Sequence, residues 1–301
     1  MISIEPSDGI VGATVNGVDL AKPLKRRVIG AILTALGRYS VLRFPNQDLN
    51  PVAQKNFAAR FGKIKSSAKH RVPDVPEVCL LSNIVEDGES IGYVDAGMMW
   101  HKDMTSDAVP GFTTILHAIK VPRRAGLALG DTQFVNAQAA TDDLPDDIKL
   151  QLKDAIGIHS SEKYNARVRD AGSKRPSFEN LPVQNPPIPH RLLIIHPVTG
   201  REILYCDPGH IVRLEGLPAG VDPDEMMKFL VAHQLQPKYH YSYSWTEGDV
   251  VMWDNLGSLH RGTLDYELDE LRLMRRSLVR GDKVFNPGFI KSTLKTVETV
   301  A

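Results

Sequence analysis

The chain has 301 residues, of which 42% are hydrophobic and 24% are charged, and its 36 basic and 36 acidic side chains give a formal net charge of zero. This length allows one large domain or two ordinary ones, and the composition is that of a soluble globular protein. Because the net charge is zero, no overall electrostatic attraction draws the chain to nucleic acid or to a membrane surface, and neither partner is expected.

The beginning of the chain and its two cysteines indicate a cytoplasmic location. Glu5 and Asp8 stand where a signal peptide would need an apolar run, and no stretch is long enough to cross a bilayer. Cys79 and Cys206 have neither metal nor redox spacing, which predicts buried free thiols in a reducing compartment. We therefore expect a soluble, intracellular protein.

The first sixty residues predict a hairpin and two helices. An Asn-Gly pair at 16–17 lies between apolar positions, which is typical of a hairpin turn. Apolar residues at helical spacing predict a helix over 28–36, and VLRF at 41–44 predicts a short buried strand. A second helix is expected to begin at Pro51 and to continue through Phe57 and Phe61.

The rest of the chain alternates short strands with helices. The strands are predicted at 113–121, on both sides of a Thr-Gly turn within 191–206, and at 239–245, 250–255 and 271–279. Helices are predicted at 142–156, with Pro145 near its start, and at 221–234, with Asp222 as N-cap. Many short strands with helices outside predict a single mostly β domain, a sandwich or a barrel.

The segment 160–190 breaks this pattern. It is polar, rich in proline and without periodicity over some thirty residues. A loop of this length in a compact domain is either a functional lid or a mobile, disordered insert. The sequence leaves both interpretations open.

Two potential metal ligands, His101 and Asp103, stand two residues apart in GYVDAGMMWHKDMTSD (92–107). On a strand, this spacing places both side chains on one face. With 10 histidines and 36 acidic residues in the chain, however, chance alone supplies about one such pair. The pair therefore predicts a metal site only if another segment supplies a third ligand.

His260 is the candidate for that third ligand, since it follows the predicted strand VVMWDN and a turn at 255–257. Two histidines and one carboxylate on one face of a metal ion leave three positions open. This arrangement suits Fe(II) chemistry in which a co-substrate and O₂ both bind the metal. For any single histidine, the alternative is that the ring satisfies a local backbone group.

Arg272 and Arg276 lie four residues apart in LRLMRRSLV and share one face of the predicted strand with Met274. Because a guanidinium is seldom buried without an anion, the pair favours an anion site. The alternative is an exposed edge strand protected by charge. Thr132, in the turn Gly-Asp-Thr, offers a hydroxyl for a carboxylate beside an arginine, although such a triplet alone indicates only a turn.

The order of these pieces resembles the TauD/TfdA family of Fe(II)- and 2-oxoglutarate-dependent dioxygenases. The matching segments, which cover nearly the whole chain, are GATVNGVDLAKPL (12–24), WHKD (100–103), GDT (130–132), HPVTGREILY (196–205), WDN (253–255) with His260, and RLMRRS (272–277). The resemblance implies an oxidoreductase with flanking helices around a double-stranded β-helix core, a jelly roll of the cupin type. It also implies the cofactors Fe(II), 2-oxoglutarate and O₂, with succinate and CO₂ as products.

Carried onto this sequence, the resemblance implies that His101, Asp103 and His260 bind the iron. The presence of Asp103 argues for hydroxylation, because halogenating relatives leave this position free for a halide.

The resemblance also assigns the anion-binding residues. Thr132 and Arg272 would hold the distal carboxylate of 2-oxoglutarate, and Arg276 would face the anionic group of the substrate or support the co-substrate. A few extra residues precede the turn at 130–132, which affects the placement of Thr132 relative to the family pattern.

The expected substrate is a small anionic organic molecule, such as an aryl or alkyl carboxylate, an aryloxyalkanoate or a sulfonate-like acid. Ser67 stands where taurine-oxidising members carry a sulfonate-binding histidine, so taurine itself is not expected. Met99 and its neighbours around the His-x-Asp segment either fill the core or contact the substrate. Tyr93 is a further candidate for substrate contact.

Three alternatives stay open at this point. The same cofactors can support desaturation or oxidative cleavage instead of hydroxylation. A zinc-dependent hydrolase can use the same three ligands with a bound water, although it needs no arginine pair and no general base stands out. A non-catalytic binding protein of the same fold would be expected to lack a ligand. A homo-oligomer, either a dimer or a tetramer, is expected.

Overall fold

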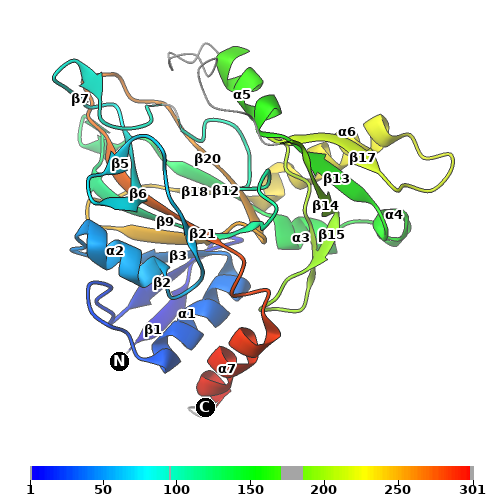
Figure 1. Cartoon of the computed structure of the whole chain (residues 1–301), viewed down its shortest axis with the longest axis horizontal. Helices are drawn as coiled ribbons and strands as arrows, with labels where there is room; N and C mark the ends of the chain where they lie inside the picture. Colours follow the sequence, from blue (N-terminus) through cyan, green and yellow to red (C-terminus); the bar gives the residue numbers. More distant parts are fainter. Residues whose placement is uncertain (1, 95, 171–185, 299–301) are drawn as a thin grey trace.

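The computed structural model describes residues 2–94, 96–170 and 186–298. It is mostly β structure with helices on the outside, as predicted (Figure 1). The largest sheet has nine strands in the order β1-β2-β3-β19-β9-β21-β6-β5, with β4 paired to β21. Its strands are β1 (Ser3–Pro6), β2 (Ala13–Asn16), β3 (Val41–Phe44), β4 (Ile64–Lys65), β5 (Arg71–Val72), β6 (Val75–Ser82), β9 (Gly111–Lys120), β19 (Val250–Asp254) and β21 (Leu273–Arg280).

The first hairpin differs from the predicted one. The Asn-Gly pair at 16–17 does not lead into a returning strand, because β2 ends at Asn16 and pairs with β1 before it and with β3. The chain after Gly17 bonds to a side chain instead: the backbone N–H of Leu20 donates to Oε1 of Gln47 at 2.9 Å, and Leu20 is buried. Burial of Leu20 in the main core therefore outweighs the local turn preference.

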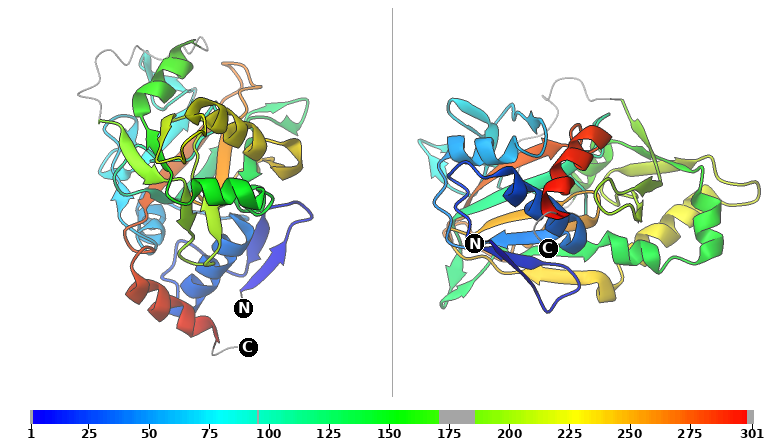
Figure 2. Two further views of the ribbon diagram at one scale, coloured as in Figure 1. Left: turned by 90° about the vertical axis from the view of Figure 1, so that its right-hand side faces the viewer. Right: turned by 90° about the horizontal axis from the view of Figure 1, so that it is seen from below.

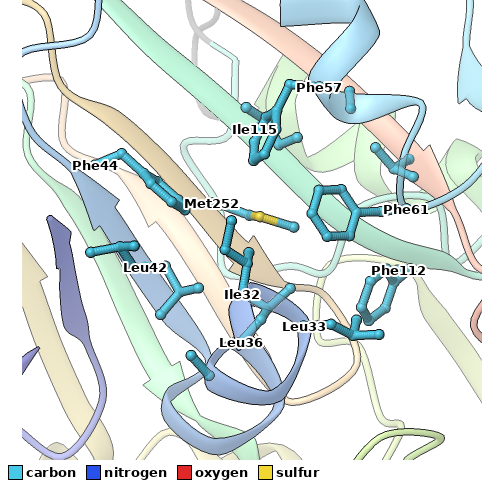
Figure 3. Packing of buried hydrophobic residues seen from close by; sticks show 14 of the residues in the cluster. Ile32, Leu33, Leu36, Leu42, Phe44, Phe57, Phe61, Phe112, Ile115 and Met252 are labelled. Carbon is cyan, nitrogen blue, oxygen red and sulfur yellow. The ribbon is translucent and has the colours of Figure 1, made fainter. Parts of the chain in front are cut away.

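The helix predicted over 28–36 is α1 (Arg26–Tyr39), which covers one face of the large sheet (Figure 1). Its side chains Ile32, Leu33 and Leu36 are completely buried. They pack against residues of the sheet, among them Phe44 and Met252 (Figure 3). The apolar period of 3.6 residues in the sequence thus corresponds to the buried side of this helix.

The second predicted helix is α2 (Pro51–Ala58), and Phe61 lies just beyond its end. Oδ1 of Asn50 accepts a hydrogen bond from the backbone N–H of Ala53 at 2.8 Å, which caps the first turn. Phe57 and Phe61 enter the same core as α1 (Figure 3). The C-terminal helix α7 (Pro287–Glu298) also packs on this side, through Phe289, Ile290 and Leu294.

A second sheet faces the opposite side of the large one. Its strands are β18 (His240–Tyr243), β12 (Thr132–Asn136) and β20 (Ser258–Gly262), in that order. Side chains alternate along β19, so that Met252 joins the core under α1 while Trp253 joins a cluster with Phe134 of β12. The rings of Trp253 and Phe134 meet edge to face with centroids 5.6 Å apart. The two sheets therefore enclose a separate apolar layer.

A third group of elements forms the right-hand part of Figure 1 and is seen from two other sides in Figure 2. It consists of the sheet β14 (Ile188–Arg191), β13 (Ile156–His159) and β17 (Ile211–Glu215), the hairpin β15 (Leu193–Ile195) and β16 (Glu202–Leu204), and the helices α3 (Ala137–Asp142), α4 (Asp146–Leu152) and α6 (Pro223–Gln234). The predicted hairpin within 191–206 and both predicted helices are confirmed here. Asp222 caps α6, as predicted, by accepting the backbone N–H groups of Asp224 and Glu225.

The remaining short elements are the hairpins β7 (Val85–Glu86) with β8 (Glu89–Ser90) and β10 (Arg123–Arg124) with β11 (Leu127–Ala128), and the 3₁₀ turn η2 (Pro237–Tyr239). The expectation of an aperiodic segment over 160–190 is wrong for its first part, because α5 (Ser161–Asp170) is a helix. Residues 171–185 of that segment lie outside the described residues. Among the helices that the structure describes, none combines the length and hydropathy needed to cross a bilayer. Cys79 and Cys206 are free and buried, as predicted.

Candidate metal centre

His101 and His260 come together through an isolated backbone bridge between two distant segments. His101 N–H donates to the carbonyl of His260 at 3.1 Å, and His260 N–H donates to the carbonyl of His101 at 2.9 Å. His260 belongs to β20, whereas the segment around His101 forms only this bridge and no longer strand. The bridge places the two imidazole rings 4.2 Å apart between their centroids.

Asp103 completes the group. Its Oδ1 lies 3.7 Å from Nε2 of His101, and its Oδ2 lies 3.4 Å from Nε2 of His260. All three residues are buried, and their possible ligand atoms lie within 4.8 Å of one another. Between the two ligands, Lys102 is completely buried, and its Nζ bonds to the carbonyls of Leu256 and Ser258.

The Asp103 carboxylate is held by a network of neutral side chains. Thr114 of β9 donates from Oγ1 to Oδ2 of Asp103 at 2.5 Å, and Asn255 donates from Nδ2 to the Thr114 hydroxyl at 3.0 Å. Oδ1 of Asn255 in turn accepts the indole N–H of Trp253 at 3.1 Å and the backbone N–H of Asp103 at 3.4 Å. These contacts hold Oδ2 of Asp103 near His260, while Oδ1 lies toward His101.

The histidines present their Nε2 atoms to the centre. Nδ1 of His101 lies 2.7 Å from the carbonyl of Met99, so Nδ1 carries a proton and Nε2 is the nitrogen that can bind a metal ion. Burial, followed by the neighbouring His101, lowers the pKa of His260 to about 3. His260 is therefore neutral at physiological pH, which is the form that binds metal ions.

The charge of Asp103 is maintained despite its burial. Burial by itself raises the pKa of this carboxyl, but His260, His101 and the guanidinium of Arg276 outweigh it and hold the pKa well below its usual range. Nη1 of Arg276 lies 3.9 Å from Oδ1 of Asp103. The centre thus contains one ionised carboxylate and two imidazoles.

This donor set fits a divalent metal ion. Two donor atoms that each lie about 2.1 Å from one ion, at right angles, are about 3.0 Å apart. The distances of 3.4 and 3.7 Å from the carboxylate to the two Nε2 atoms need only small side-chain movements to reach that value. All three donors come from one side, which leaves room for other ligands on the other side.

A cavity of about 160 Å³ opens beside this group, and His101 and Asp103 line it. Arg276 of β21 lines it, as do Tyr93 and Met104, and two further residues that the sequence did not single out, Tyr164 and His210. The ring of Tyr164, from α5, stacks on that of His210 at 4.8 Å and lies 5.4 Å from the ring of His101. The only signal for these residues was the position of Tyr164 in the aperiodic segment.

His210 is oriented by a buried carboxylate. Its Nδ1 lies 2.7 Å from Oδ2 of Asp207, a residue that is completely buried. The same Oδ2 accepts the hydroxyl of Thr105 at 2.7 Å, and Oδ1 accepts the backbone N–H of Gly209 at 2.9 Å. Burial raises the pKa of Asp207, but His210 outweighs it and the pKa is lowered overall. The ionised Asp207 fixes the proton of His210 on Nδ1, so Nε2 is the ring nitrogen that is left for another partner.

Arg272 lies just before β21, and its side chain is buried near the start of β12. Asn83 accepts its backbone N–H at 2.7 Å, and Ser82 donates to its carbonyl at 2.7 Å. Its Nε is buried and has no hydrogen-bond partner among the described residues. A Cβ atom on Gly130, whose φ is +73°, would lie 3.2 Å from this Nε and 3.1 Å from Tyr266. Glycine is therefore required where the turn approaches Arg272.

Thr132 begins β12, two residues after this glycine, and is buried. Its Oγ1 accepts the indole N–H of Trp245 at 3.0 Å. Because the indole can only donate, the hydroxyl proton of Thr132 is free to be donated to another acceptor. Arg272, which Gly130 approaches, and Thr132, which follows this glycine, thus both offer donors near one turn.

The other predicted substrate residues differ in position. Ser67 donates its hydroxyl to the carbonyl of Lys69 at 2.6 Å and lies 3.5 Å from the Tyr93 hydroxyl, so it lies behind Tyr93. Met99 supplies a backbone carbonyl to His101, and the structure does not place its side chain in the cavity wall; Met104 lies there instead. Arg276 shares one face of β21 with the buried Met274, as predicted.

The sequence profile described as "Taurine catabolism dioxygenase TauD, TfdA family" matches residues 3–278. The chain belongs to the TauD/TfdA family. It is 29% identical over 291 residues to pentalenolactone F synthase of Streptomyces avermitilis, with 92% of this chain and 93% of that protein covered. It is 30% identical over 280 residues to the alpha-ketoglutarate-dependent 2,4-dichlorophenoxyacetate dioxygenase of Burkholderia sp., with 89% and 90% covered.

Solved structures of the TauD/TfdA family are similar over nearly the whole chain. A taurine dioxygenase from Burkholderia xenovorans superimposes with a TM-score of 0.73 at 26% identity and covers 93% of this chain and 90% of its own. AAD-2, solved in complex with Mn(II) and N-oxalylglycine, also has a TM-score of 0.73 at 26% identity, with 93% and 98% covered.

Membership of the TauD/TfdA family makes this protein a 2-oxoglutarate-dependent dioxygenase, and hence an oxidoreductase. The family's cofactors are Fe(II), 2-oxoglutarate and O₂. The zinc hydrolase considered from the sequence is therefore set aside.

Proposed function

We propose that this dioxygenase hydroxylates a small anionic organic substrate, using iron held by His101, Asp103 and His260. The observation that carries the proposal is the convergence of these three buried side chains at the edge of a cavity that His101, Asp103 and Arg276 line. A ferrous ion bound there supplies the oxidising chemistry of the family, with 2-oxoglutarate and O₂ as co-substrates. The residues described below would position the two organic molecules.

The distal carboxylate of 2-oxoglutarate would lie between Arg272 and Thr132. The support is a buried guanidinium with an unpartnered Nε and a hydroxyl whose proton is available, near one glycine turn. Burial lowers the pKa of Arg272, yet arginine keeps its charge over the physiological range. An anion is the partner that such a buried cation lacks.

The anionic group of the primary substrate would face Arg276. This guanidinium lines the cavity and lies at the edge of the metal centre, and its Nε is also buried without a hydrogen-bond partner in the described chain. His210, on the cavity wall, offers Nε2 as a second polar contact. Met104 and Tyr164 provide apolar surface for an aryl or alkyl body.

The fold would position the metal ligands and the substrate and would exclude water from the centre. The two facing sheets would form the double-stranded β-helix core of the family, with the metal centre at the border of the layer that contains Phe134 and Trp253. Because the three ligands are 5 to 6% exposed, few water molecules can reach the reacting atoms. The substrate would be held by Arg276 with a C–H bond directed toward the metal-facing side of the cavity.

The test is succinate release from 2-oxoglutarate with a panel of acids. 2,4-Dichlorophenoxyacetate, (S)-2-phenoxypropionate and hexyl sulfate represent the chemistry named for relatives of this chain. At least one anion should stimulate succinate release, and mass spectrometry should find a product derived from a one-oxygen addition. The methyl ester of 2,4-dichlorophenoxyacetate is the neutral control. Equal turnover of acid and ester would refute the requirement for an anion, and a product that has only lost hydrogen would indicate desaturation.

A further inference from the structure

The lysine between two of the proposed metal ligands is completely buried, which is rare for this residue type. From the sequence alone, Lys102 was the polar middle residue of His-x-Asp and had no assigned role. Lys102 is among the residues that line the cavity, but its ammonium group bonds to backbone carbonyls of residues 256 and 258. An ammonium group is costly to bury unless other groups replace the water that it loses.

Two backbone carbonyls and one aromatic ring lie around this ammonium group. Nζ of Lys102 donates to the carbonyl of Leu256 at 2.8 Å and to the carbonyl of Ser258 at 3.1 Å. It also lies 5.7 Å from the centroid of the Tyr205 ring, within range of a cation–π contact. Leu256 lies in the connection between β19 and β20, and Ser258 is the first residue of β20.

That connection leads directly to the third ligand. β20 begins at Ser258, and His260 is its third residue. The ligand segments are otherwise joined by the His101–His260 bridge and by the 3.4 Å contact from the backbone N–H of Asp103 to Asn255. Lys102 adds two charge-assisted hydrogen bonds that also connect the segment of His101 and Asp103 to the segment that leads to His260.

We propose that Lys102 is a positioning residue that sets the separation between the His101–Asp103 segment and His260, and thereby the affinity of the centre for metal. The inference rests on the proposed metal ligands. It goes beyond them, because Lys102 donates to the backbone and not to a metal, a co-substrate or a substrate. One side chain thus connects the segments that carry all three ligands.

The test measures binding of Mn(II) to the full chain without turnover, from the electron paramagnetic resonance signal of the free ion. Lys102→Met keeps the length of the side chain and removes the ammonium group. We expect its Mn(II) affinity to fall at least about tenfold, the range seen when groups that support metal ligands are removed. Lys102→Gln keeps a donor on a shorter side chain and should give an intermediate affinity.

A matched control separates positioning from a general loss of stability. Gln54 of α2 is also completely buried. Its Nε2 donates to the backbone carbonyl of Arg275 at 3.0 Å. Gln54→Met should lower the melting temperature and leave Mn(II) affinity within twofold of the wild type. If Lys102→Met does not fold, Lys102→Gln carries the same comparison.

Three results would overturn the inference, and they differ in what else they affect. Wild-type affinity in both Lys102 variants would leave the metal ligands intact and remove the positioning role. An equal loss in Gln54→Met would show that stability alone controls metal binding. No Mn(II) binding by the wild type would reject the proposed metal centre itself, and the positioning role with it.

Discussion

The hydroxyl of Thr114 donates to Oδ2 of Asp103 at 2.5 Å, and this contact links the central strand β9 of the large sheet to the metal centre. Thr114 is completely buried, and Asn255 donates to its hydroxyl, so its proton has Asp103 as its acceptor. The carboxylate that would bind iron is therefore oriented by the sheet itself. Groups of this kind fix ligand orientation and are needed for full metal affinity.

Replacing Thr114 with valine should weaken the site while preserving the shape of the core. Without the hydroxyl, Asp103 loses its strongest orienting contact and Asn255 loses an acceptor, so we expect metal affinity or turnover to fall about 10- to 100-fold. Circular dichroism should show an unchanged fold. Thr114→Ser keeps the hydroxyl and should stay near the wild type; an equal loss in both variants would point to the methyl group instead.

Arg272→Ala should raise the KM for 2-oxoglutarate far more than the KM for the primary substrate. Loss of a charge-assisted contact of about 1.5–3 kcal/mol corresponds to roughly a 10- to 100-fold increase. Steady-state kinetics with an acid that stimulates succinate release, varying that acid and 2-oxoglutarate in turn, measures both values. Arg272→Lys keeps the charge without the planar fork and should recover part of the loss. The opposite pattern would exchange the roles of Arg272 and Arg276.

Asp207→Asn should affect the primary substrate and spare 2-oxoglutarate. An amide offers a single acceptor oxygen where the carboxylate serves Thr105, Gly209 and His210, so the imidazole would lose its fixed orientation. We expect the KM for an acid that stimulates succinate release to rise about tenfold, in line with one net hydrogen bond to a charged group. A larger rise in the KM for 2-oxoglutarate than in the KM for the acid would mean that Asp207 and His210 do not serve the primary substrate.

Acid should destabilise the protein through His159, which is completely buried beside His190 and Tyr205. Burial lowers its pKa to about 4 in the folded state, below the value of about 6.5 in an unfolded chain. The unfolded state therefore binds the proton first, so stability is lost as the pH falls from 6.5 toward 4.

Between pH 7 and 5, His159 should account for about 2 kcal/mol of lost stability. Urea denaturation at the two pH values measures the loss, and the same comparison in His159→Gln isolates this residue. Between pH 7 and pH 5, the free energy of unfolding of the variant should fall by about 2 kcal/mol less than that of the wild type. An identical loss in both proteins would assign the acid sensitivity to other groups.

The sequence was sufficient where a single periodic or local signal determined the outcome. The helix α1 follows from apolar residues spaced 3.6 apart, and the cap of α6 from Asp222 before a proline. His101, Asp103 and His260 could be proposed together because the first two share a local spacing and the third follows a recognisable turn. Their convergence needed the resemblance to a family, since no local pattern shows that β20 lies beside residue 101.

Contacts that depend on tertiary packing could not be predicted. The Asn-Gly pair at 16–17 has a strong turn preference, yet burial of Leu20 decides the path of the chain. Thr114 and Lys102 owe their roles to neighbours at residues 103 and 256–258, which no local spacing relates to them. Tyr164 reaches the cavity from the segment 160–190, whose composition suggested only a loop. His210 reaches it from just beyond the hairpin predicted within 191–206.

The most direct test of the proposed centre is an anaerobic visible-absorption titration of the purified protein with Fe(II) and then 2-oxoglutarate. We expect a metal-to-ligand charge-transfer band to appear on addition of 2-oxoglutarate, to be perturbed by candidate acids, and to be absent in folded His260→Ala. Iron bound by the wild type without any such band would contradict chelation of 2-oxoglutarate at this centre.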